Sequence, residues 1–139
     1  MIEIYKRVMF DNYANFSGRA RRSEFWYTTL INTIFFIISF ICLFKFINIS
    51  DIVSYTIGGI IVLFFFITLI PRLALISRRL HDTGKSGWFY LLTFIPGGNL
   101  ILLIFFIMDS QPGSNQWGPN PKETDDSINE IGNDLIERY

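Results

Sequence analysis

Cysteine and histidine are almost absent from this sequence of 139 residues, which holds one of each, Cys42 and His81. One cysteine has no partner for a disulfide bond within the chain. One cysteine and one histidine also fall short of the ligand set that a zinc site needs. We therefore expect no intrachain disulfide, no metal site and no cofactor.

Charged residues are absent from three long apolar stretches, which run from 25 to 44, from 52 to 70 and from 87 to 108. Fifteen residues are phenylalanine, more than a soluble domain of this size normally buries. A bilayer core about 30 Å thick requires roughly 20 apolar residues in a helix that rises about 1.5 Å per residue. The sequence therefore predicts an integral membrane protein.

Acidic and basic residues are balanced at twelve each, but they are unevenly distributed. Residues 1–24 hold five Lys and Arg against three acidic residues, and residues 71–86 hold four together with His81 against Asp82 alone. The short segment 45–51 has one charge of each sign. Because basic segments stay on the cytoplasmic side, we expect the N-terminus and residues 71–86 to be cytoplasmic in a bacterial inner membrane.

The third apolar stretch contains the helix-breaking sequence Pro96-Gly97-Gly98. As one kinked helix, its residues span the bilayer and place the C-terminus outside. As two halves of about ten residues, each half reaches only about 15 Å and the stretch forms a re-entrant hairpin. We favour the kinked span and keep the hairpin as the alternative, so the side of the C-terminus stays open.

These patterns predict an all-α membrane protein built as a bundle of three transmembrane helices. The predicted spans cover about residues 25–44, 52–77 and 87–108. Apolar residues at spacings of three and four predict an amphipathic helix over 2–16 that lies in the membrane interface. Residues 1–122 form the membrane domain, and 123–139 are expected to form an acidic, flexible tail.

Three polar motifs flank the apolar stretches. They read FSGRARRSEFW from Phe16 to Trp26, RRLHDTGKSGW from Arg78 to Trp88, and DSQPGSNQWGPNP from Asp109 to Pro121. In this order and spacing they resemble domain of unknown function 805, a family of small bacterial inner-membrane proteins of the YhaH type. The resemblance covers about residues 5–122 and implies a multi-pass membrane protein without an established activity, so it carries over no catalytic residue. The family positions are Gly18, Arg19, Arg22, Glu24, Phe25, Trp26, Arg78, Arg79, His81, Asp82, Gly84, Ser86, Gly87, Trp88, Gly118, Asn120 and Pro121.

The second motif also contains two patterns that are typical of enzymes. The run Gly84–Ser86 matches the end of a phosphate-binding loop, but Arg79 stands where that loop requires its first glycine. The pair His81-Asp82 is typical of a general base with its orienting carboxylate, but the sequence pairs no serine or cysteine nucleophile with it. We therefore expect that this protein is not an enzyme.

The basic residues of the first two motifs approach the same membrane face. In one interpretation they are solvated charges that only set the topology. In the other, Glu24 and Asp82 are structural counter-charges for some arginines, and the remaining cations form a basic pocket at headgroup depth. The candidate residues for binding anionic lipid or a partner are Arg19, Arg21, Arg22, Arg78, Arg79, His81 and Lys85. The candidate turns and interface anchors are Gly18, Trp26, Gly84, Gly87, Trp88, Gly118, Asn120 and Pro121.

The sequence favours a non-enzymatic membrane component that binds lipid or protein. We expect membrane lipids as partners, above all anionic phospholipid, together with a homo-oligomer or another membrane protein, and no nucleic acid. The alternative is an oligomeric channel or transporter for an ion or small solute. The absence of charge inside the apolar stretches weighs against transport, whereas the break at Pro96–Gly98 favours it, since broken helices often frame binding sites.

Overall fold

The computed structural model describes residues 1–46 and 51–123. Its helical elements are, in chain order, α1 (Ile2–Lys6), the π-helical segment η1 (Arg7–Asp11), α2 (Arg22–Phe46), α3 (Asp51–Asp82), the 3-10 helix η2 (Gly87–Phe94) and α4 (Gly98–Ile107). No β-sheet occurs within these two ranges, so the predicted all-α class is confirmed there. The predicted acidic tail lies outside the described residues, apart from Glu123.

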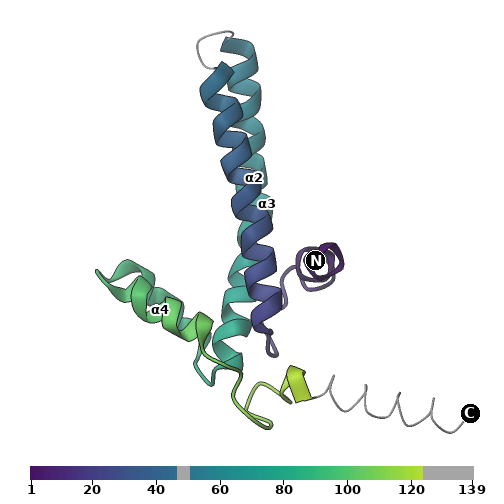
Figure 1. The fold of residues 1–139 in the computed structure, drawn as a ribbon, viewed down its shortest axis with the longest axis vertical. Helices are drawn as coiled ribbons and strands as arrows, with labels where there is room; N and C mark the ends of the chain where they lie inside the picture. Colours follow the sequence, from purple (N-terminus) through teal and green to yellow (C-terminus); the bar gives the residue numbers. More distant parts are fainter. Residues whose placement is uncertain (47–50, 124–139) are drawn as a thin grey trace, which may run out of the picture.

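The helices α2 and α3 run side by side and form the long axis of the molecule (Figure 1). Both are long and apolar enough to cross a bilayer. Many of their apolar side chains point away from the pair; Phe40 and Phe44, for example, are 66% and 73% exposed. Lipid is the solvent that suits such a surface. The helices predicted over 25–44 and 52–77 are therefore confirmed as helices.

The helix α3 continues through Pro71 because another segment replaces the hydrogen bond that proline removes. Proline has no N–H, so the carbonyl oxygen of Ile67, four residues earlier, loses its partner within the helix. The Tyr13 hydroxyl donates a hydrogen bond to this oxygen at 2.9 Å. The helix then runs on to Asp82 and carries the second motif beyond the apolar stretch.

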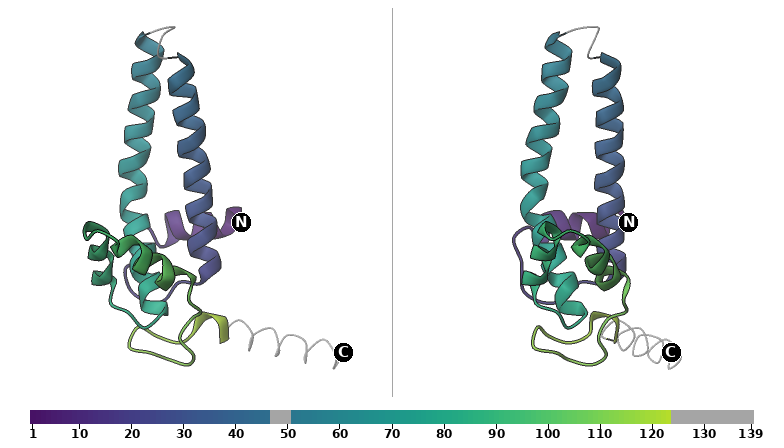
Figure 2. Two further views of the ribbon diagram at one scale, coloured as in Figure 1. Left: turned by 60° about the vertical axis from the view of Figure 1, so that its left-hand side comes forward. Right: turned by 90° about the vertical axis from the view of Figure 1, so that its left-hand side faces the viewer.

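The N-terminal segment, α1 with η1, lies across the α2–α3 pair rather than along it (Figure 2). Val8 is buried in a small core between this segment and the pair, whereas Ile2 and Phe10 are each 73% exposed. The helix predicted over 2–16 forms only from Ile2 to Asp11, as α1 and η1.

The third apolar stretch forms a hairpin of two short helices, η2 and α4. The turn between them is made by Gly97, whose φ of 82° lies in the left-handed region that glycine adopts readily. At Gly98 a Cβ atom would lie 1.9 Å from the carbonyl oxygen of Leu92. The glycine pair therefore allows the two arms to pack closely together.

Both ends of this hairpin lie at the same end of α3. At its start, Gly87 packs so tightly against Ser77 that a Cβ atom would lie 2.2 Å from the Ser77 hydroxyl oxygen. At its end, Arg79 donates to the carbonyl oxygens of Phe106 and Met108. One span would separate the two ends by about 30 Å. The favoured kinked helix over 87–108 is therefore wrong, and the hairpin kept as its alternative describes the backbone.

Candidate functional site

The carboxylate of Asp82, the last residue of α3, is fully buried and joins all three motifs. Its Oδ1 accepts a hydrogen bond from Arg19 Nε at 3.0 Å. Its Oδ2 accepts hydrogen bonds from Arg79 Nη1 and from Ser110 Oγ, each at 2.5 Å. The side chains of Arg19 and Arg79 are 1% and 0% exposed. We call these four residues the Asp82 cluster.

The two arginines of the Asp82 cluster also bind backbone carbonyl oxygens. Arg19 donates to the oxygens of Gln111 at 2.5 Å and Gly113 at 2.8 Å, which fixes the loop that follows the hairpin. Arg79 binds the oxygen of Phe106 at 3.1 Å and that of Met108. These carbonyls belong to the C-terminal end of α4, where a helix lacks hydrogen-bond donors and carries partial negative charge. The cluster thus holds the hairpin and the following loop against α3.

Arg21 and Arg22, the other first-motif arginines, bind the same C-terminal region. Arg22 Nη2 lies 3.1 Å from Asp109 Oδ1, and Arg22 Nη1 donates to the carbonyl oxygen of Ile107 at 3.3 Å. Arg21 donates to the carbonyl oxygen of Pro121. These contacts supplement those of the Asp82 cluster but are more exposed, since the Arg22 and Asp109 side chains are 46% and 58% exposed.

The remaining basic candidates lie apart from the Asp82 carboxylate. Arg78 is 5% exposed, and its Nε and Nη2 have no hydrogen-bond partner among the described residues. Lys85 Nζ donates to the carbonyl oxygen of Thr83 and lies 5.2 Å from the centre of a phenylalanine ring of α4. Glu24, proposed as a counter-charge, has its Oε1 3.8 Å from Arg7 Nη1. The structure therefore brings Arg19 and Arg79 together at Asp82 and leaves Arg78 and Lys85 outside.

Two exposed carboxylates next to the Asp82 cluster have lowered pKa values. The backbone N–H of Ser110 and the positive charge of Arg22 lower the pKa of Asp109 below its ordinary value of 3.8. Hydrogen bonds from the Gly113 backbone and the Asn120 side chain lower the pKa of Glu123 below its ordinary value of 4.5. Sequence reasoning missed Ser110, Asp109 and Glu123 as partners, because nothing in the spacing shows that the loop returns to α3.

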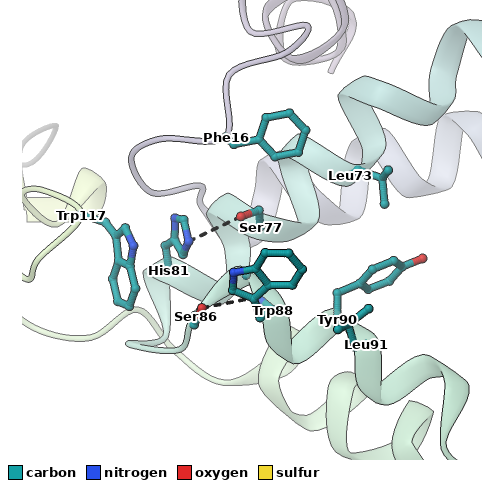
Figure 3. A pocket seen from close by; sticks show the side chains of 10 residues that line it. Phe16, Leu73, Ser77, His81, Ser86, Trp88, Tyr90, Leu91 and Trp117 are labelled. Atoms are coloured by element: carbon teal, nitrogen blue, oxygen red, sulfur yellow. Dashed lines mark hydrogen bonds between the residues drawn. The ribbon is translucent and has the colours of Figure 1, made fainter.

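His81, next to Asp82 in the chain, lines a cavity of about 580 Å³ (Figure 3). Its Nδ1 lies 3.2 Å from the carbonyl oxygen of Gly18, and since a carbonyl only accepts, Nδ1 carries the proton. Its Nε2 is then an acceptor for the Ser77 hydroxyl at 3.4 Å. Its ring stacks on Trp117 with centroids 4.4 Å apart. The carboxylate of Asp82 instead faces the cluster arginines, so the hydrogen bond that orients His81 comes from Gly18.

The predicted turns adjoin the Asp82 cluster, since Gly18 precedes Arg19 in the chain, Gly84 follows Asp82 by two residues and the Gly118 carbonyl oxygen accepts a hydrogen bond from Arg19. The glycines Gly18, Gly84 and Gly118 all have positive φ angles. A Cβ atom at Gly84 would lie 2.6 Å from the side-chain oxygen of Gln111, so the end of α3 and the C-terminal loop meet at close range. Asn120 is buried, while the remaining positions lie at the surface or at partly buried turns: Trp26, Gly87, Trp88 and Pro121.

The fold and this site define the class as a helical membrane protein with two bilayer-length helices and a buried ionic cluster at one end. The sequence profile described as "Protein of unknown function (DUF805)" matches residues 13–119, and the chain belongs to this family. It is 43% identical over 113 residues to inner membrane protein YhaI of Escherichia coli K12, covering 80% of this chain and 89% of that protein. It is 40% identical over 124 residues to inner membrane protein YhaH of the same strain, covering 85% of this chain and 95% of that protein. No solved structure matches the chain. The chain is thus an inner-membrane protein of the DUF805 family, as the resemblance implied.

Proposed function

We propose that this protein is a non-enzymatic component of the bacterial inner membrane that binds anionic phospholipid at its basic end. The basic end is formed by residues 1–24 and 71–123. The observation that carries the proposal is its charge: these residues include ten Lys and Arg against six Asp and Glu. At the opposite end, Lys45 and Asp51 balance each other.

The positive charge available to lipid comes from residues outside the Asp82 cluster. Asp82 and backbone carbonyls already occupy Arg19 and Arg79, which have almost no exposed surface. Lys6 on the N-terminal segment is instead exposed, and Arg7 beside it is 60% exposed although its Nη1 lies 3.8 Å from Glu24. Each basic side chain near an anionic membrane surface contributes about 1 kcal/mol.

The proposed membrane boundary lies close to Pro71. Counted from Asp51, the first residue of α3, about 20 residues at about 1.5 Å each span a hydrocarbon core of about 30 Å. The N-terminal segment and the η2–α4 hairpin lie beside the helix pair (Figure 2), and they contact α3 on either side of Pro71, Tyr13 at Ile67 and Gly87 at Ser77. Trp88 and Phe94 of the hairpin are 78% and 80% exposed, as suits a segment whose surroundings are lipid. We therefore place the hairpin in the cytoplasmic interface and both termini on the cytoplasmic side.

Native mass spectrometry of the full chain from mild detergent tests lipid binding and reports oligomeric state in the same spectra. The parent should retain phosphatidylglycerol in preference to phosphatidylcholine. The double variant Lys6→Gln/Arg7→Gln loses two charges, about 2 kcal/mol, and should bind phosphatidylglycerol roughly 30-fold more weakly. Lys45→Gln at the opposite end is the control and should match the parent. Equal retention of the two lipids by the parent would refute the proposal.

A further inference from the structure

A small cavity between α2 and α3 contains polar groups that lack partners. It has a volume of about 180 Å³ and is lined by residues of both helices and by Phe106 of the hairpin helix α4. Phe25 and Phe106 form part of its wall, and its polar lining residues are Thr28, Thr29, Asn32 and Arg72. Thr28 and Asn32 are one helical turn apart on α2 and therefore share a face, opposite Arg72 on α3.

Two of these polar groups are buried without hydrogen bonds. Thr28 and Asn32 are 1% and 2% exposed, and the Thr28 hydroxyl and the Asn32 Nδ2 have no partner within the described structure. The Tyr5 hydroxyl donates a hydrogen bond to Asn32 Oδ1 at 3.0 Å. The oxygen of the Asn32 amide therefore has a partner, whereas its Nδ2 has none. Buried polar groups in proteins are almost always paired, so two orphaned atoms at one cavity point to a missing partner.

The polar groups around the cavity favour a negatively charged partner. The Asn32 Nδ2 and the Arg72 guanidinium are only donors, and the Thr28 hydroxyl donates as well as accepts. None of the ion pairs among the described residues involves Arg72, and no carboxylate lines the cavity. An anion satisfies all three groups at once, whereas a cation would meet the charge of Arg72 at close range.

The depth of the cavity fits a phosphate at the membrane surface. Arg72 follows Pro71 directly and is the first charged residue of α3 after the apolar stretch. We propose that the cavity binds a phosphate group, with Arg72 as its counter-charge and with Asn32 and Thr28 as hydrogen-bond donors. As a site for anionic lipid this inference rests on the proposed function, but the same chemistry also accepts free phosphate.

The test uses the full chain in neutral detergent with Thr28→Val, which removes the hydroxyl at constant shape, and Arg72→Gln, which removes the charge. Thr33→Val, at an exposed position of the same helix, is the matched control. One arm measures melting temperature in inorganic phosphate against chloride at equal ionic strength. The other arm measures retained phosphatidylglycerol by native mass spectrometry.

A free phosphate ligand predicts a rise in melting temperature with phosphate that is lost in Thr28→Val and Arg72→Gln and kept in Thr33→Val. A lipid ligand predicts instead that retained phosphatidylglycerol falls in the same two variants. In either arm Arg72→Gln should weaken binding by about tenfold or more, as expected for a lost hydrogen bond to a charged group.

If neither phosphate nor phosphatidylglycerol responds to Thr28→Val and Arg72→Gln, the cavity holds only water and this inference is wrong. Loss of phosphatidylglycerol in Lys6→Gln/Arg7→Gln alone would leave the proposed function standing while the cavity fails. The opposite result, a phosphate effect that depends on Thr28 in a protein without lipid preference, would refute the proposed function and support the cavity.

Discussion

The variant Asp82→Asn should unfold much more easily than the parent, because it leaves two buried guanidinium groups without a counter-charge. Arg19 and Arg79 are at most 1% exposed, and Asp82 is their common carboxylate at 3.0 and 2.5 Å. The asparagine amide also points a donor at a guanidinium group, which itself only donates. Removing one partner of a buried ion pair costs about 3–5 kcal/mol, whereas an exposed pair contributes about 0–1 kcal/mol. We therefore expect Asp82→Asn to lower the free energy of unfolding by about 3–5 kcal/mol.

The assay is unfolding in detergent, followed by tryptophan fluorescence, with two variants for comparison. Asp109→Asn removes an exposed partner of Arg22 and should leave the unfolding curve close to that of the parent. Glu24→Gln removes a carboxylate that is 16% exposed and lies 3.8 Å from Arg7, so its cost should fall between the other two. If Asp82→Asn is as stable as Asp109→Asn, the Asp82 cluster does not hold the motifs together and the reasoning fails.

Three further predictions concern the contacts around the cluster. Tyr13→Phe removes the hydrogen bond to the Ile67 carbonyl oxygen and should cost about 0.5–1.5 kcal/mol in unfolding free energy, and a parent-like value would contradict this. Asp109 and Glu123 have lowered pKa values in the folded state, so the stability they contribute is complete above their ordinary values of 3.8 and 4.5 and is lost as pH falls through the lowered values. The melting temperature should therefore fall below about pH 4, and fall less in the double variant Asp109→Asn/Glu123→Gln. Gly98→Ala should lower the melting temperature, since its Cβ would overlap a carbonyl oxygen of η2.

Length and apolar composition predict the two long helices correctly because they depend on local chain properties. The stretch 87–108 meets the same criteria, yet it folds as a hairpin. Its sequence shows the break at Pro96–Gly98 but not the angle that the break produces. That angle depends on Arg79 and Arg22, which bind the C-terminal carbonyls of α4 from other elements. Apolar periodicity carries no information about such contacts.

The sequence predicted which charged residues form the candidate site, but not which groups they bind. Because the motifs hold more arginines than carboxylates, the sequence predicted that Asp82 is a counter-charge for some of them. The structure places the Asp82 carboxylate between Arg19 and Arg79. Ser110, 28 residues away in sequence, donates a further hydrogen bond to the Asp82 carboxylate, and no sequence pattern identifies it as a partner. Asn32 likewise has no sequence signal as a binding residue, whereas the structure buries its Nδ2 without a partner and places the residue in the lining of a cavity. Long-range contacts decide these roles.

Thiol labelling in cells tests most directly the central claim that all three motifs meet on the cytoplasmic side. In a Cys42→Ala background, single cysteines replace Ser17, Ser114 or Asp51. The account predicts that a membrane-impermeant reagent labels the Asp51 position in intact cells, and labels the Ser17 and Ser114 positions only after lysis. Labelling at Ser114 without lysis would place the third motif outside, and would contradict both the hairpin and a lipid site built at the basic end.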